Sequence, residues 1–447
     1  MKEARELTTG VVTTDNALTS VVHEILDHQG IIYENISPNE QDSSTIFPVV
    51  ILPEYTEQGF SAAKKICVSE ENVLIADKIV NLRKIRQFLA GEISVKGDQF
   101  DLYINTEETN LVSQVKDRLA RLNLPLVRKS FWPNKARACC VITHDIDWFT
   151  YSPFHKAVLG GDLNPLQAVK LFVTNLFRRR NYGWNIPEMV DLEVNHDCKS
   201  TFLFRTEYPE RELTYLDQSL QLLKEKIERK QGFEIALHGA HSSHHDLKAL
   251  ETELSLFREK VGQETVGIRY HILKFIPPQT WKIESEKNIL YDATFSYNEY
   301  FGFRGEVCFP YHPCSDVGRL PLIELPTSFM DWTLLHRKKR GRSAESTLQR
   351  VKESVERYNG VLTVNFHNTY INQQTFPDIY ELYASLLSQV AAEKYWVATA
   401  SECARWWNER TSAKPNPRIT SSGEITAFRT LVELDVIDTK EFSVKYN

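Results

Sequence analysis

The 447-residue sequence lacks the features that mark a membrane or secreted protein. No run approaches the roughly 20 apolar residues that a membrane-spanning helix needs. The first ten residues contain no apolar stretch of the kind found in secretory signals. We therefore expect no transmembrane segment and a cytoplasmic location. The seven cysteines, an odd number, favour reduced thiols over a disulfide framework.

The sequence also lacks an excess of positive charge. It has 53 Lys and Arg against 59 Asp and Glu, and a formal net charge of -6. No nucleic-acid partner is expected, because contacts to a phosphate backbone require a basic surface. A hydrophobic content of 42% is typical of a folded globular chain. The length exceeds what one hydrophobic core usually organises, which favours two domains.

Short apolar runs alternate with helical patterns along most of the chain, and this alternation predicts an α/β fold. In residues 1–130 it predicts a small α/β layer domain, in which 100–104 is one of the strands. In residues 131–410 about seven such runs fit an α/β barrel or an open doubly wound sheet, and we expect a distorted (β/α)7-type barrel. Residues 151–198 are too long for one crossover and predict an insertion beside the site. Residues 411–447 predict a tail with accessory strands.

Two acidic residues follow the apolar run 138–142. In an extended chain, residues two apart point to the same side, so Asp145 and Asp147 would direct both carboxylates into one space. Carboxylates that close repel unless a metal ion, an arginine or a shared proton compensates them. The alternative is a pair of surface acids that cap the following helix.

A group of histidines follows the next-but-one apolar run, residues 233–237. Four of the 13 histidines fall within eight residues: His238, His241, His244 and His245. Neutral imidazoles are common ligands of zinc and similar metals, and an Asp with two His leaves a coordination position open for water. The pattern favours a metal site over a polar loop.

Two further apolar runs end in residues of the same kind. Arg269 ends one and His367 follows another. Taken singly, Arg269 is equally typical of a salt bridge at the edge of a core, and His367 of a structural histidine. Together the four strand ends supply a carboxylate pair, a histidine cluster, an arginine and a histidine, which are the groups needed for metal-assisted hydrolysis.

The order and spacing of these motifs over residues 137–407 resemble those of the polysaccharide deacetylases, the NodB-homology group of carbohydrate esterases. Thr143 to Asp147 is similar to the family's first motif in a branch that reads His-Asp-x-Asp. The strand ending in His238 resembles the second motif. Arg269 is similar to the arginine of the third motif, in which His271 replaces the usual Pro. His367 resembles the histidine of the fifth.

This resemblance implies roles for three residues in catalysis. Asp145 would be the general base, Arg269 would orient it, and His367 would be the general acid that protonates the departing amine.

The resemblance also implies one divalent metal, for which zinc is expected. Asp147, His238 and His241 would hold this metal, with His245 in place of either histidine as an alternative. Asp331 and Trp332 loosely resemble the fourth motif and would bind substrate.

The predicted function is therefore hydrolysis of an N-acetyl group from a sugar or glycan intermediate. Asp/His metal sites at barrel strand ends also serve metal phosphoesterases and cyclic amidohydrolases, so these are alternatives. A non-catalytic glycan-binding protein on a degenerate barrel is another, because Ile146 separates the two Asp and the histidine spacing is irregular. The sequence does not indicate an oligomeric state.

Overall fold

The computed structural model describes most of the chain. The residues outside the description are 1–4, 14–16, 38–46, 150–183, 229–231, 241, 317, 338–342, 374–375, 421, 438–443 and 447. Most of the predicted insertion at 151–198 therefore lies outside the described residues, and the part that is described contains helix α7 (Ile186–Val194). Within the described residues, no helix has both the length and the apolar character needed to cross a membrane.

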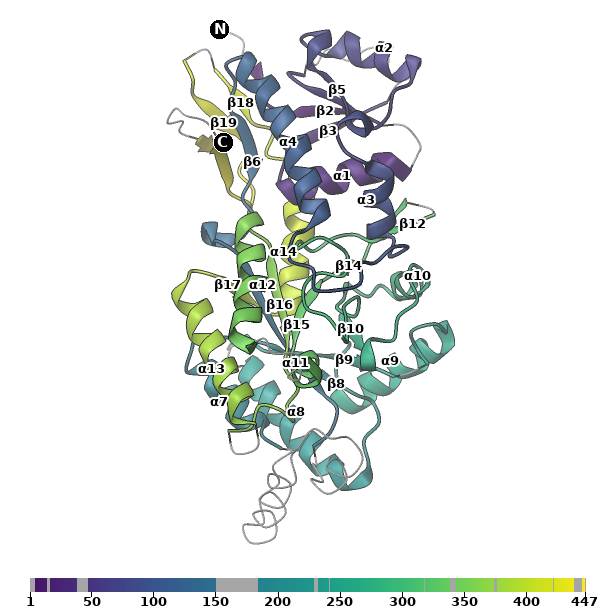
Figure 1. The fold of residues 1–447 in the computed structure, drawn as a ribbon, viewed down its shortest axis with the longest axis vertical. Helices are drawn as coiled ribbons and strands as arrows, with labels where there is room; N and C mark the ends of the chain where they lie inside the picture. The colour runs from purple at the N-terminus through teal and green to yellow at the C-terminus, as the bar shows by residue number, and fades with distance from the viewer. Residues whose placement is uncertain are drawn as a thin grey trace.

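A nine-stranded sheet lies at the centre of the larger unit, and its strand pairs are parallel (Figure 1). Its strands are β7 (Cys139–Ile146), β8 (Thr201–Phe204), β9 (Glu234–Gly239), β10 (Gly267–Tyr270), β11 (Tyr291–Asp292), β14 (Ile323–Glu324), β15 (Thr327–Met330), β16 (Val361–Asn365) and β17 (Trp396–Ala398).

The order of these strands makes the sheet a distorted barrel. The strand order is β14-β11-β10-β9-β8-β7-β16-β15, and β17 pairs with the first half of β7. The two edge strands, β14 and β15, are separated in the chain only by Leu325 and Pro326, so the sheet curls back on itself as a half-barrel. The predicted (β/α) barrel is confirmed. The two-residue strand β11 was not predicted, because it is too short to show a periodic pattern.

Strand β7 shows how the sheet divides the core. Cys139 and Val141 face the barrel interior, where they belong to a core that also includes Val11 of the N-terminal layer. Cys140 and Ile142 face outward and join the core beneath the surrounding helices. This alternation is the two-residue period of a strand. It places Thr143 and Asp145, which continue the spacing of Cys139 and Val141, on the side of the barrel interior.

Helices cover the outside of the barrel. They are α7, α8 (Leu213–Glu228), α9 (Leu247–Val261), α10 (Gln279–Glu286), α11 (Asp331–Arg337), α12 (Ala344–Tyr358) and α13 (Pro377–Ala392). Helix α14 (Ala400–Ser412) instead packs into the core that the barrel shares with the N-terminal layer, through Cys403 and Trp407. Helix α9 is capped at its amino end by Asp246, whose side chain accepts hydrogen bonds from the backbone amides of Lys248 and Ala249. At its carboxyl end it is capped by Gly262 in a left-handed conformation (φ 75°). These are favourable capping residues, and they fix where the loop after β9 ends.

The N-terminal layer is a four-stranded parallel sheet with helices. Its strands, in the order β3-β2-β4-β5, are β2 (Thr9–Val12), β3 (Tyr33–Ile36), β4 (Val50–Leu52) and β5 (Val73–Ile75), and its helices are α1 (Ala17–Gln29), α2 (Glu57–Ile66), α3 (Leu82–Leu89) and α4 (Tyr103–Arg121). The strand predicted at 100–104 was wrong, because α4 begins at Tyr103. The apolar Phe100 and Leu102 are buried in the core beneath the barrel helices, not in a sheet.

The C-terminal segment returns to the N-terminal layer, so both ends of the chain lie at the same end of the molecule (Figure 1). Strands β18 (Arg418–Ile419), β19 (Ile425–Ala427) and β21 (Val444–Tyr446) form a sheet with β1 (Arg5–Glu6). Strand β20 (Leu434–Ile437) pairs with β6 (Leu126–Lys129). The core shared by layer and barrel is thereby covered by strands from both ends of the sequence.

A buried charged network joins the N-terminal layer to the barrel. His28 on α1 contacts Glu108 on α4, and its Nε2 lies 3.2 Å from Oε1 of Glu24. Arg319, on the short hairpin of β12 (Cys314–Ser315) and β13 (Gly318–Arg319), places Nε 2.9 Å from Oε2 of Glu24. Burial alone would lower the pKa of His28, but the carboxylates of Glu108 and Glu24 raise it to about 9.

This raised pKa predicts a stability that falls at high pH. The stabilisation from protonated His28 is complete below its unfolded pKa of about 6.5 and disappears as the pH rises through about 9. The gap in free energy of unfolding between the wild type and His28→Gln should narrow by on the order of 2 kcal/mol between pH 7 and pH 10. Urea unfolding of both proteins measures the gap, and a gap independent of pH would contradict this account.

Candidate metal centre

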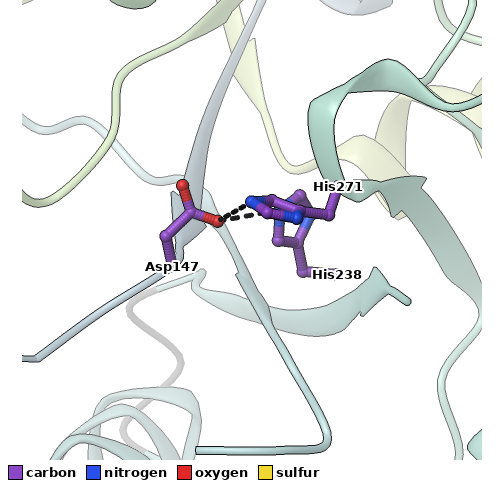
Figure 2. A group of neighbouring side chains, drawn as sticks. All are labelled: Asp147, His238 and His271. Carbon is purple, nitrogen blue, oxygen red and sulfur yellow. Dashed lines mark ion pairs between the residues drawn. The ribbon is translucent and has the colours of Figure 1, made fainter. Parts of the chain in front are cut away.

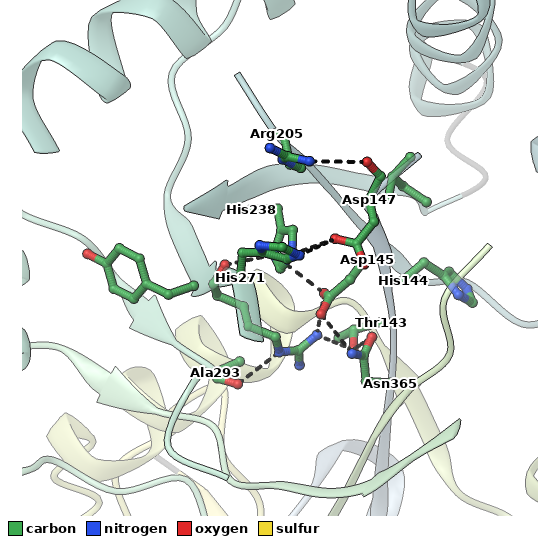
Figure 3. A network of polar contacts seen from close by, with 12 residues as sticks. Thr143, His144, Asp145, Asp147, Arg205, His238, His271, Ala293 and Asn365 are labelled. Carbon is green, nitrogen blue, oxygen red and sulfur yellow. Dashed lines mark hydrogen bonds and ion pairs between the residues drawn. The ribbon is translucent and has the colours of Figure 1, made fainter. Parts of the chain in front are cut away.

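The carboxyl ends of four barrel strands converge on one space (Figure 3). The side chains that meet there are those of Asp145 in β7, Asp147 directly after β7, His238 in β9, His271 directly after β10 and His367 after β16. Parallel strands place their carboxyl ends at the same edge, which is where ligand sites of barrels form. The sequence pattern had placed all but one of these residues at strand ends for this reason.

Asp147, His238 and His271 form a group that can hold a metal ion (Figure 2). Oδ1 of Asp147 lies 3.2 Å from Nε2 of His238 and 3.3 Å from Nε2 of His271. Within the described residues this is the one group of three such side chains whose ligand atoms all lie within 4.8 Å of one another. His271, which was not among the predicted ligands, completes this group within the described residues, and His241 as a ligand stays a prediction.

The two other candidate histidines stand differently. His241 lies outside the described residues. His245 is not in the metal-binding group; its Nδ1 lies 3.4 Å from Nδ1 of His244, and the two rings are in edge contact.

The hydrogen bonding of His238 prepares it as a ligand. Its Nδ1 lies 2.9 Å from the carbonyl oxygen of Arg269. A carbonyl only accepts, so Nδ1 carries a proton, and in the neutral ring that a metal ligand requires Nε2 would present its lone pair toward Asp147. Histidines that bind metals are commonly fixed in this way by a hydrogen bond on the other ring nitrogen.

Two buried acceptors facing each other indicate that a cation belongs between them. Neither Nε2 of His238 nor Oδ1 of Asp147 has a hydrogen-bond partner, and both atoms are buried. Leaving two acceptors unsatisfied in a buried site is costly, and a divalent metal would satisfy both. The carboxylate and imidazole donors present suit zinc, and three protein ligands leave a position open. The residues therefore fit the metal that the sequence predicts.

Electrostatics keep Asp147 ionised, as a ligand must be. Burial alone would raise the pKa of this carboxyl. The contact with His238, together with the charges of His367 and His271, instead holds its pKa well below the usual range.

Arg269 and Asp145 form a buried ion pair beside the metal-binding group. Nη1 of Arg269 lies 2.9 Å from Oδ1 of Asp145, and the two side chains are 0% and 4% exposed. The guanidinium is fixed on its other sides by the carbonyl of Ala293 (2.9 Å) and by the hydroxyls of Thr143 and Thr327 (both 2.8 Å). These partners lie in β7, directly after β11 and in β15, so the barrel itself orients the arginine.

Asp145 is held at both oxygens. Its second oxygen, Oδ2, accepts a hydrogen bond of 2.8 Å from Nδ2 of Asn365 on β16. Burial alone would raise the pKa of Asp145, but the Arg269 guanidinium, followed by His238 and His367, lowers it. The carboxylate is therefore charged, oriented and directed toward the space beside the metal ligands.

His367 is oriented by Asp331. Nδ1 of His367 lies 2.6 Å from Oδ1 of Asp331, and its backbone amide donates to Oδ2 at 2.7 Å. Burial alone would lower the pKa of His367, but the Asp331 carboxylate, with Asp147 and Asp145 next, raises it to about 9. Nε2 faces the site, 3.9 Å from Asp145 and 3.8 Å from Asp147.

Asp331 and Trp332 lie in different surroundings. Asp331 is 0% exposed, and both of its oxygens are hydrogen-bonded to His367; its expected contact with substrate stays a prediction. Trp332 lines a pocket of about 220 Å³ that also contains the metal-binding group, Asp145 and His367. Trp148 and Tyr370 are further aromatic walls of this pocket.

The sequence analysis did not include His271 among the candidate ligands. A signal was present, because His271 follows Arg269 by two residues at the end of β10, as Asp147 follows Asp145 at the end of β7. The histidine cluster after β9 was the more conspicuous pattern and drew the assignment away from β10.

No protein-family model and no curated protein matches the chain. Solved structures of similar fold include one described as a polysaccharide deacetylase from Mycobacterium smegmatis, with 16% identity, a TM-score of 0.41, and coverage of 62% of this chain and 92% of that one. Puue allantoinase has 15% identity, a TM-score of 0.44, and coverage of 63% and 93%. A probable polysaccharide deacetylase from Pseudomonas aeruginosa PAO1 has 14% identity, a TM-score of 0.43, and coverage of 65% and 96%. Likenesses of this extent concern the fold alone.

The buried pair of Arg269 and Asp145 predicts a large effect on stability. Arg269→Met would leave the Asp145 carboxylate buried without its cation, and the free energy of unfolding should fall by about 3–5 kcal/mol. Adding Asp145→Asn to that variant should restore part of the loss, because the amide carries no charge. Urea unfolding of the two single variants and the double variant measures the coupling. Strictly additive losses would show that the two groups do not stabilise each other.

Proposed function

We propose that this chain is a metal-dependent hydrolase that removes N-acetyl groups from a sugar or glycan intermediate. One observation carries the proposal: the unsatisfied acceptors of Asp147 and His238 point at each other in a pocket that also holds an ionised, arginine-bound carboxylate. Metal ligands, a base and an acid therefore share one space, as metal-assisted hydrolysis of an amide requires.

In this proposal Asp147, His238 and His271 hold one divalent metal, with zinc as the metal that the donor set favours. A bound divalent cation would polarise the acyl carbonyl and lower the pKa of a water bound to it. His271 is the second histidine ligand in this assignment, in place of His241.

Asp145 is the proposed general base. Arg269 and Asn365 each donate one hydrogen bond to it, which fixes the carboxylate while leaving further lone pairs free to accept a proton. A carboxylate with a lowered pKa is ionised at neutral pH and so is ready to take the proton of an attacking water.

His367 is the proposed general acid. The pKa of about 9 that Asp331 and the two site aspartates give it keeps the ring protonated at neutral pH. An amine leaves readily only once it is protonated, and Nε2 of His367 faces the pocket where the departing nitrogen would lie. Asp331 acts through His367 by holding its Nδ1.

The lining of the pocket supports a neutral ring-shaped substrate. Trp148, Trp332 and Tyr370 offer aromatic faces and Met330 an apolar one, and such surfaces pack against the apolar faces of sugar rings. The residues that line the described pocket include neither Lys nor Arg, which disfavours a phosphate ester as substrate. Hydrolysis of a cyclic amide would use the same metal ligands, base and acid. A non-catalytic glycan-binding protein would need no base. Activity assays therefore separate these alternatives.

Metal binding should depend on the proposed ligands. Purified wild type should contain about one equivalent of divalent metal, and His238→Ala or His271→Ala should lose most of it, because each removes one of three protein ligands. His245→Ala is the matched control, since this neighbouring histidine lies outside the group. Elemental analysis provides the measurement. Metal retained by His271→Ala but lost by His245→Ala would refute the ligand assignment.

Deacetylation should depend on Asp145. Asp145→Asn should release acetate from N-acetylated sugars on the order of 10²-fold more slowly than wild type or worse, because the amide cannot accept the proton. Its metal content should stay near that of wild type, since Asp145 is not a proposed ligand. A phosphate monoester and a cyclic amide belong in the same substrate panel. Acetate release by Asp145→Asn at the wild-type rate would exclude Asp145 as the base.

A further inference from the structure

The chain between α3 and α4 contacts the barrel close to the metal centre. We call residues 91–101 the clamp segment and residues 296–303, which follow β11, the rim loop. The rim loop donates three hydrogen bonds to the clamp segment: from the amide of Phe301 to Oδ1 of Asp98 (3.0 Å), from the hydroxyl of Tyr297 to the carbonyl of Val95 (2.7 Å), and from the amide of Phe303 to the carbonyl of Gln99 (3.4 Å). In return, the amide of Gln99 donates to the carbonyl of Phe301 (2.9 Å). The two segments thus form a continuous polar contact.

The backbones approach so closely that one position in the rim loop requires glycine. Gly302 has a φ of +97°, and a Cβ at this position would lie 1.8 Å from the carbonyl oxygen of Gln99. Gly91, at the start of the clamp segment, packs in the same way against Pro277, where a Cβ would lie 2.4 Å from the proline ring. The clamp segment therefore contacts both the rim loop and the chain that follows the His271 turn.

The rim loop in turn holds the turn that presents His271. Nδ2 of Asn298 donates to the carbonyl oxygen of Ile272 at 3.0 Å. The carbonyl of Asn298 accepts from the hydroxyl of Thr333 at 3.0 Å. Thr333 lies on α11, the helix that begins with Asp331. Asn298 thus joins the turn at His271 to the helix that orients His367.

The turn at His271 needs such support, because its backbone is unfavourable. Ile272 and Leu273 have φ values of 54° and 53°, in the left-handed region that β-branched and bulky residues avoid. Ile272 is also 52% exposed, so burial of its side chain does not compensate. Strained turns of this kind persist where surrounding contacts determine them, and they are concentrated at functional sites.

We infer that the clamp segment is a positioning element for the metal ligand His271, acting through the rim loop and Asn298. The inference rests on the proposed metal centre and gives the N-terminal layer a part in it. The inference rests on three steps. Asp98 and Val95 hold the rim loop, and Asn298 of that loop holds Ile272. The turn at Ile272 then places Nε2 of His271 3.3 Å from Oδ1 of Asp147.

The test is metal affinity in the full-length protein. Asp98→Ala combined with Tyr297→Phe removes the two donations from the rim loop to the clamp segment that depend on a side chain. This double variant should bind Zn²⁺ about tenfold more weakly than wild type, since loss of groups that orient a ligand typically weakens affinity by 10- to 100-fold. Asn298→Ala, which removes the direct link, should show a loss at least as large. Competition with a chelator measures each affinity, and the absorption spectrum of the Co²⁺ form reports on ligand geometry.

Two control variants separate positioning from general stability. Tyr395→Phe also removes one tyrosine hydroxyl hydrogen bond, to Glu356 at 2.8 Å, but away from the site, and should bind Zn²⁺ as wild type does. Asp98→Asn retains an oxygen that can accept a hydrogen bond from the amide of Phe301, so this variant should keep the Zn²⁺ affinity of wild type.

The outcomes distinguish this inference from the function on which it rests. A folded double variant with wild-type affinity, or an equal loss in Tyr395→Phe, would overturn the positioning role while His271-dependent metal binding stood. Wild-type protein that binds no Zn²⁺ would overturn the proposed metal centre and the positioning role together. A loss of Zn²⁺ affinity that is confined to the double variant and Asn298→Ala, with an altered Co²⁺ spectrum, supports the positioning role.

Discussion

The buried pair of Arg269 and Asp145 is the constraint on which the site depends. A guanidinium with no solvent exposure persists only if the barrel satisfies its donors, and here hydroxyls, a carbonyl and one carboxylate from several strands do so. Arg269 also acts through its own backbone, because its carbonyl oxygen accepts a hydrogen bond from Nδ1 of His238 and so orients that ring. One residue of β10 therefore sets the direction of the proposed base and the ligand form of a neighbouring histidine.

The site separates two carboxylates by their partners. Asp145 is bound by Arg269 and Asn365, whereas Asp147 faces histidines and keeps an oxygen without a hydrogen-bond partner. Two aspartates at the end of one strand can therefore take different roles, because the strand supplies their common direction and the surrounding elements supply different neighbours. A comparable division holds for the histidines, since Asp331 raises the pKa of His367, whereas the carbonyl of Arg269 orients His238 so that its Nε2 faces Asp147.

The N-terminal layer is more than an appendage. Its core continues into the barrel at the amino ends of the strands, opposite the metal centre, and its charged network reaches the β12–β13 hairpin. The chain between α3 and α4 extends to the rim loop near the other end of the barrel. The layer therefore contacts the barrel both where the strands begin and near the loops that present the site.

The amino-acid sequence by itself determined the strand and helix alternation of the barrel and the chemical types at four strand ends. The two-residue period of a strand was enough to place Asp145 and Asp147 on one side. Only the tertiary structure decided which histidine completes the group. Sheet register sets Arg269 opposite His238, and a left-handed turn held by Asn298 carries His271 to Asp147. Local patterns report which side of its own strand a residue faces; they carry no information about the distance between side chains on different strands, which depends on register, turn conformation and the contacts of distant segments.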